Sequence, residues 1–277
     1  MTALEKLMTA IGFEDSDKNE ILAFASDTNH AEAMAYIHGC LDRKEWGILR
    51  EKTDDPVYAM AALAVILKLA VSVWEEYERR GISEEIYLDT MSDIRVWAYN
   101  HKRASGHLGL SELEWVIGFA TFGRFKLGRL QYNFTVYNKE DERDASMPLS
   151  TGDCMLDVHI QQDGAFTDEL CGESLAMAAE FFRIQFPERD IKGFMCHSWL
   201  LSPGLAQVLP ETSNIIKFGK RFTIIDNQTE NDGQAIERIF DTKFKESGSK
   251  PTSLQIKAKA LLDSGGHLGN ALGVILL

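Results

Sequence analysis

The sequence is poor in proline, in paired cysteines and in basic residues, and each shortage excludes a class of protein. With 6 prolines and 21 glycines in 277 residues, it is neither collagen-like nor of low complexity. None of the 4 cysteines forms a C-x-x-C pair, and no apolar signal segment follows Met1. We therefore expect free thiols in a reduced, cytoplasmic protein, without a structural zinc site. The net charge of -13 argues against a nucleic-acid-binding protein, which usually presents a basic face.

The sequence also lacks a long uncharged apolar run. Its longest apolar stretch covers residues 57–74, where Lys68 interrupts it and Glu75 and Glu76 follow at once. A membrane span needs about 20 residues with few or no charges. We therefore predict a buried helix and no membrane partner.

The hydrophobic periodicity changes near residue 123, which predicts an α+β protein with domains over residues 1–123 and 124–277. The first part repeats its apolar residues with helical spacing and indicates a bundle of roughly five helices. The clearest of them cover residues 31–41, 57–79 and 84–100. A Ser-x-x-Glu capping box predicts that another helix begins after Ser111. This part is also acidic, with 21 Asp and Glu against 12 Lys and Arg.

The second part alternates strands with helices and predicts a mixed α/β sheet. The expected strands cover residues 129–137, 153–161, 193–201, 222–225 and 271–277. The expected helices cover residues 170–186, 235–244 and 254–263, and a further helix is expected near Leu205. Because a helix joins the strands at 153–161 and 193–201, those two strands are predicted to be parallel.

The strand over residues 153–161 has two faces of different polarity. One face is apolar and consists of Cys154, Leu156, Val158 and Ile160. The other face carries Asp157, His159 and Gln161. Central strands of such sheets are usually apolar on both faces, so the polar face indicates a solvated edge strand or a ligand-binding cleft. The helix that follows favours the cleft, since ligands bind beyond the C-terminal ends of the strands.

His197 is a second candidate on the strand over residues 193–201. Its face also carries Met195, Trp199 and Leu201, and a lone histidine on such an apolar face is more often a core residue than a catalytic one. If the two strands are neighbours, His159 and the pair His197 and Ser198 lie at similar heights. Two imidazoles beside one crevice are plausible proton-transfer groups.

A glycine turn links the first of these strands to the next helix. A turn that leads into a helix presents backbone N–H groups to an anion. The turn contains no Lys or Arg, and Asp168 and Glu169 follow it. An ordinary N-cap at Thr167 or Asp168 accounts for the same residues. A metal site with Asp157 and His159 as two ligands is a weaker alternative, because no third ligand with a fitting spacing is evident and His267 is only a candidate for it.

Several ordered motifs resemble a bacterial family of predicted acyltransferases with a helical N-terminal domain and a GNAT-like C-terminal domain. The match covers most of residues 125–277. The motifs are Val158-His-Ile-Gln-Gln-Asp-Gly-Ala-Phe-Thr, Glu173-Ser-Leu, Cys196-His-Ser-Trp-Leu-Leu-Ser-Pro, Ser213-Asn-Ile-Ile-Lys-Phe and Gly265-Gly.

The resemblance implies a mixed sheet whose two central parallel strands, at 153–161 and 193–201, splay apart to admit the pantetheine arm of an acyl donor. The donor would be acyl-CoA or an acyl carrier protein, with no metal. The family pattern Gln/Arg-x-x-Gly-x-Gly/Ala keeps Gln161 and Gly164 here and departs at Phe166. The residues expected to bind the donor are Ile160, Gln161, Gly164, Ala165, Phe166 and Thr167.

The expected reaction is N-acyl transfer to a small-molecule amine acceptor. His159 is the first candidate for the general base, with Asp157 as the carboxylate beside it. His197 is the second candidate, either as the base or as the acid that protonates the departing thiolate. The rival hypothesis is a non-catalytic binding or scaffold protein on the same fold, because a fold does not determine a function.

Overall fold

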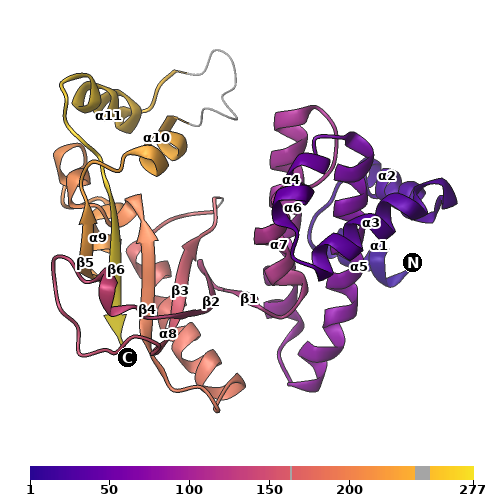
Figure 1. Cartoon of the computed structure of the whole chain (residues 1–277), viewed down its shortest axis with the longest axis horizontal. Coiled ribbons are helices and arrows are strands. Elements are labelled where there is room, and N and C mark those ends of the chain that lie inside the picture. Colours follow the sequence, from indigo (N-terminus) through magenta and orange to yellow (C-terminus); the bar gives the residue numbers. More distant parts are fainter. Residues whose placement is uncertain (163, 241–249) are drawn as a thin grey trace. The chain divides into compact units, whose positions relative to one another are not determined.

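The chain divides close to the residue where its hydrophobic periodicity changes. A computed structural model describes residues 1–162, 164–240 and 250–277 (Figure 1). They form two compact units, Met1–Lys126 and Leu127–Leu277. Each unit has its own core and its own architecture.

The first unit is a helical bundle, as predicted, with more helices than the five expected. Its α-helices are α1 (Ala3–Ala10), α2 (Asp15–Ser26), α3 (Ala31–Asp42), α4 (Trp46–Lys52), α5 (Pro56–Arg79), α6 (Glu84–Ser105) and α7 (Leu113–Ala120). The capping box at Ser111 was a wrong prediction, because α7 begins after Glu112 and no side chain caps it. The Ser111 hydroxyl instead lies 3.3 Å from Nδ1 of His101.

Helix α5 occupies the centre of this bundle. Among the described helices, it is long and apolar enough to cross a membrane by length and composition. Its side chains from Ala59 to Leu67 are all buried inside the unit, as are Ala70 and Tyr77. Asp55 caps its N-terminus, and Pro56 occupies the first turn, where the missing N–H costs no hydrogen bond. This packing is that of a core helix.

The described strands form one sheet, in the order β1-β2-β3-β4-β6-β5. They are β1 (Arg124–Leu127), β2 (Leu130–Val136), β3 (Cys154–Ile160), β4 (Ile191–Ser198), β5 (Thr223–Gln228) and β6 (Asn270–Leu276) (Figure 1). β3 and β4 are parallel, which confirms the prediction from their helix crossover, and each has an antiparallel partner on its other side. β1 was not expected from the sequence.

Helix α8 (Asp168–Gln185) covers one face of this sheet. Phe182 on the helix packs against Tyr132 of β2, with ring centroids 6.4 Å apart. Ser174 on the same helix is buried, accepts the N–H of Leu130 at 3.0 Å and lies 2.9 Å from the Tyr132 hydroxyl. Burial of these rings and satisfaction of these polar groups fix α8 across β2.

The opposite face is covered over only part of its length. Met147 and Leu149, in the loop after β2, pack in a cluster with Met155 of β3 and Met195 of β4. Met155 is therefore fully buried although it shares a face with Asp157 and His159. The cluster covers this face of the sheet around Met155, near the start of β3, and Asp157 and His159 lie further along the same strand.

The remaining elements lie around β5 and β6. They are the 3-10 segments Trp199–Leu201 and Pro203–Gln207, and the helices α9 (Asn214–Gly219), α10 (Gly233–Phe240) and α11 (Ser253–Asp263). The strand predicted over 193–201 ends at Ser198, because the Ser198 hydroxyl accepts the N–H of Leu200 and starts a tight turn. Residues 241–244 of the predicted helix lie outside the described residues.

Candidate active site

The two central strands separate after their first half. Parallel pairing of β3 with β4 runs from Cys154 to Asp157, which lies opposite Met195. Both strands continue for three residues, each held by its outer neighbour. Ile160 of β3 still pairs with Leu130 of β2, and Ser198 of β4 still pairs with Ala271 of β6. Within the described residues, the parallel ladder therefore opens while both antiparallel ladders stay closed.

His159 lies on β3 beyond the last parallel pair, as predicted for a residue at this opening. Its Nε2 is 2.8 Å from Oδ1 of Asn133 and 3.1 Å from Oδ2 of Asp157. The side chains of His159 and Asp157 are 26% and 31% exposed, so both are half-buried rather than sealed in the core. Asn133 was not identified from the sequence. Asn133 pairs with Asp157 across the ladder of β2 and β3, so its side chain lies on the same face as His159, two residues along from Asp157.

These contacts determine which nitrogen of His159 carries the proton in the neutral ring. Asn133 Nδ2 donates to the carbonyl of Phe134, so its Oδ1 is the atom that faces the imidazole. Oδ1 of Asn133 and the carboxylate of Asp157 are both acceptors, so Nε2 is the protonated nitrogen. The basic lone pair is therefore on Nδ1.

His197 lies on β4, on the same face of the sheet as His159. This follows from the register, because Asp157 pairs with Met195 and each histidine is two residues further along. Its side chain is exposed, not part of the core, and its Nε2 is 3.3 Å from Oε1 of Gln228. Gln228 Nε2 in turn donates to the buried Asp226 at 2.7 Å. The structure thus places the two histidines on opposite sides of the opening.

The predicted donor turn leads from β3 into α8. Thr167 is the N-cap of α8, and its hydroxyl accepts the N–H of Leu170, so the capping interpretation is confirmed. Gly164 has φ of +86°, a conformation that L-residues rarely adopt. Phe166, where the sequence departs from the family pattern, packs edge-on against Phe218 of α9 at 5.2 Å.

Two arginines from elsewhere in the chain reach this turn. Arg129, between β1 and β2, donates to the carbonyls of Gln161 at 2.9 Å and Ala165 at 2.8 Å. Arg221 donates to the Asp168 carboxylate at 2.8 Å. The sequence shows no basic residue within the turn, and only the fold brings these two cations beside it. They offset the acidic residues at the start of α8.

The cysteines nearest the opening do not form nucleophiles. Cys196 of β4 is buried, and burial raises the pKa of its thiol well above the ordinary value. Burial also raises the pKa of Cys171 on α8 to about 11. Thiolates are the reactive form of cysteine, so this site favours direct transfer over a covalent thioester on the protein.

The described residues contain no group of three or more His, Cys, Asp and Glu side chains that could hold a metal ion. Asp157 lies beside His159, whereas His267 pairs with Asp232 at 2.7 Å. Asp232 also accepts the N–H groups of Leu268 and Gly269, so this pair shapes the turn before β6.

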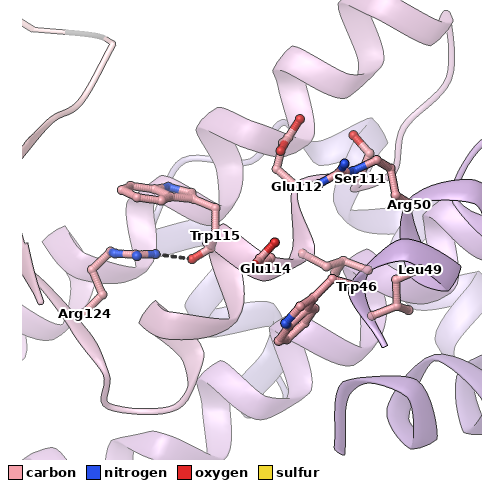
Figure 2. A pocket seen from close by; sticks show the side chains of 9 residues that line it. Trp46, Leu49, Arg50, Ser111, Glu112, Glu114, Trp115 and Arg124 are labelled. Carbon is pink, nitrogen blue, oxygen red and sulfur yellow. Dashed lines mark hydrogen bonds between the residues drawn. The ribbon is translucent and has the colours of Figure 1, made fainter. Parts of the chain in front are cut away.

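The helical unit has a cavity of its own of about 320 Å³ (Figure 2). Trp46 and Trp115 lie along it with the carboxylates of Glu112 and Glu114. The Trp115 indole is held firmly: the Arg124 guanidinium lies 3.5 Å from its ring centroid, and its Nε1 donates to the buried Asp93 at 3.0 Å. A cavity of this size fits a small molecule or part of a larger one.

Comparisons with known proteins agree with this architecture. Residues 2–121 match the N-acyltransferase N-terminal domain. No curated protein matches the chain. Among solved structures, an acyltransferase in complex with decanoyl-CoA and teicoplanin has a TM-score of 0.77 at 23% identity, over 98% of this chain and 87% of that one. An acyltransferase in complex with decanoyl-CoA has a TM-score of 0.75 at 24% identity, over 98% and 86%.

At these identities the solved structures establish the fold, and the family rests on the sequence match. Residues 125–275 match the GNAT-like C-terminal domain, which is more than half of the chain. The chain therefore belongs to the GNAT-like acyltransferase family.

Proposed function

We propose that the protein is an N-acyltransferase that moves an acyl group from acyl-CoA to the amine of a small-molecule acceptor. The observation that carries this proposal is the opening between β3 and β4, with His159 beside it. An acyl carrier protein is a second possible donor, because it presents the same pantetheine arm. The free thiols support a reducing compartment, and we propose the bacterial cytoplasm.

The donor fits the opening through backbone hydrogen bonds. Beyond Asp157 and Met195 the facing edges of β3 and β4 leave the parallel ladder. A pantetheine arm contains two amides and can pair with such an edge as an added strand does. The diphosphate then faces the turn with Gly164 and the N-terminus of α8, where N–H groups and the helix dipole favour an anion. Similar structures hold decanoyl-CoA and octanoyl-CoA, which supports this donor.

The reaction begins with removal of a proton from the acceptor. An ammonium cannot attack a thioester, so it first gives a proton to Nδ1 of His159. The resulting imidazolium is stabilised by the Asp157 carboxylate at 3.1 Å. The amine lone pair attacks the thioester carbonyl, and a backbone N–H in the opening binds the oxygen as it gains charge. Collapse expels the thiolate, which takes a proton from His197, and an amide remains on the acceptor.

The acidity of the helical unit supports a cationic acceptor. Residues 1–123 carry 21 Asp and Glu against 12 Lys and Arg. Its cavity offers the carboxylates of Glu112 and Glu114 to an ammonium group and two indoles to a flat ring, and the guanidinium groups of Arg50 and Arg124 balance the charge of this lining. One similar acyltransferase was solved with teicoplanin, which supports a small-molecule acceptor.

The test is acyl transfer from octanoyl-CoA to a panel of amines, followed by mass spectrometry. Replacing His159 by Ala should lower turnover by roughly 10²- to 10⁴-fold, the usual contribution of a general base. His197→Ala should lower it by less, because a thiolate is a good leaving group. His38→Ala, at an exposed site on α3, is the matched control. Full turnover by a folded His159→Ala protein would remove this residue from the mechanism.

The second candidate function is a non-catalytic scaffold protein that does not bind an acyl donor. Phe166, in place of a small residue in the donor turn, packs on Phe218 and favours this alternative. Calorimetry with acetyl-CoA, octanoyl-CoA and an acyl carrier protein separates the two functions. Heat of binding with any of these donors supports the enzyme, and no heat with all of them supports the scaffold.

A further inference from the structure

Gln131 of β2 has a buried amide group with no partner. Its side chain is 1% exposed, and among the described residues its Nε2 makes no hydrogen bond. A buried donor without an acceptor costs free energy, and most buried polar groups in proteins are paired. Glutamine at this position therefore lowers the free energy of unfolding relative to an apolar residue of the same length.

The place of this amide connects it to the candidate active site. Gln131 pairs directly with His159 across the antiparallel ladder of β2 and β3, so both side chains lie on the same face. Directly opposite residues in such a ladder have Cβ atoms about 4.5–5.5 Å apart. The residue that carries the unpartnered donor is therefore a direct cross-strand neighbour of the proposed base.

The order of the strands indicates whether the acyl donor or the amine acceptor would lie near Gln131. β3 separates β2 from β4, so Gln131 is on the side of His159 away from the opening that takes the donor. Nε2 of glutamine is only a donor, so its partner must be an acceptor atom. That partner is not the reacting amine, because the amine needs its lone pair to attack the thioester.

We propose that Gln131 binds an oxygen atom next to the acceptor's amine, and that the acceptors are amines with a hydroxyl or carbonyl oxygen on the neighbouring carbon. Gln131 is then the residue that determines specificity for this class. The inference rests on the proposed N-acyltransferase function. The acceptor supplies the missing hydrogen bond, and an amine without the oxygen leaves the buried donor unpaired.

The test compares vicinal amino alcohols with the same amines lacking the hydroxyl, such as 2-aminocyclohexanol and cyclohexylamine, with octanoyl-CoA as donor. Wild-type protein should favour the amino alcohol in kcat/KM by roughly 5- to 150-fold, the range expected when one buried group is left unpaired. Gln131→Met should remove this preference by slowing the amino alcohol alone. Gln207→Met, at an exposed glutamine, is the control.

The stability of the ligand-free protein is a second readout. It should change in one direction if Gln131 binds substrate and in the opposite direction if its amide only stabilises the fold. Gln131→Met removes the unpaired donor and should raise the urea midpoint, whereas a lower midpoint would show that the amide holds the fold and would overturn the inference. Equal wild-type rates with both amines would overturn it while leaving the proposed function intact. Transfer to other amines of the panel but to neither of these two would overturn the inference alone, and transfer to no amine of the panel would refute the proposed function and this inference with it.

Discussion

Gly193 of β4 provides a quantitative test of how closely the strands beside the opening are packed. A Cβ at this position would lie 2.1 Å from the carbonyl oxygen of Ile275 on β6 and 3.1 Å from Cε of Met155 on β3. Ordinary contacts begin near 3.4 Å. Gly193→Ala therefore requires β6 to move by more than 1 Å. Glycine is the residue that lets β4 lie this close to both neighbours.

The cost of this substitution follows from the geometry. Overpacking of a core costs about 1–3 kcal/mol, and a ladder hydrogen bond lost as β6 moves costs about 1 kcal/mol more. The alanine loses less backbone entropy on folding, which returns about 0.5–1 kcal/mol. The net expectation is a loss of about 2–3 kcal/mol in the free energy of unfolding of the unit Leu127–Leu277. Acyl transfer should fall with it, because β4 carries His197.

Urea unfolding followed by circular dichroism measures this loss, with the transition of the helical unit as an internal reference. Gly47→Ala is the matched control, since Gly47 is exposed on α4 and its Cβ would meet nothing within 4 Å. That change should stabilise the helical unit by up to about 1 kcal/mol. If Gly193→Ala costs less than about 1 kcal/mol, β4 and β6 are not in the close contact described.

Three further changes test other parts of the structure. Arg129→Ala removes the bonds to the carbonyls of Gln161 and Ala165 and should raise KM for octanoyl-CoA by about tenfold, whereas Arg183→Ala, which loses only an exposed pair with Glu180, should leave KM unchanged in steady-state kinetics. Asp93→Ala leaves the indole N–H groups of Trp97 and Trp115 unpaired and should cost about 2–4 kcal/mol in urea unfolding; an unchanged midpoint would contradict the anchoring role of Asp93. The Asp232 carboxylate raises the pKa of His267 above its usual 6.5, so this contribution to stability is complete below pH 6.5 and is lost as the pH rises through the raised value. The midpoint of urea unfolding should therefore fall more between pH 6 and pH 8 in wild-type protein than in His267→Asn, and equal falls would exclude the pairing.

Periodicity and chain order were enough to predict the two architectures and the parallel pair. Helices over 57–79 and 84–100 followed from their 3.6-residue spacing, and the polar face of β3 followed from its alternation. The wrong details depend on contacts between distant residues. Ser111 faces His101 rather than its own helix, and Ser198 ends β4 by capping a turn. Local propensity does not contain either contact.

The residues that complete the site were missed for the same reason. Asn133 and Gln131 are ordinary polar residues of an alternating strand, and only the register with β3 brings them to His159. Arg129 and Arg221 lie far from the donor turn in sequence, yet they supply its positive charge. The alternation of residues along β3 was enough to identify Asp157 and His159 from the sequence. The residues that β2 adds to the site could be identified only once its register with β3 was known.

The same pairing explains why the sheet opens where it does. The strand segment after Asp157 has an antiparallel partner in β2, and the segment after Met195 has one in β6. Parallel pairing is slightly less stable per residue than antiparallel pairing, so the seam between β3 and β4 is the least costly one to leave open. The antiparallel ladders hold the two edges apart beyond Asp157 and Met195, where no further parallel pair joins the described parts of the strands. We therefore expect an amide-bearing arm that enters the seam to form ladder bonds with these edges, so that the proposed binding of the donor completes the hydrogen bonding of the sheet.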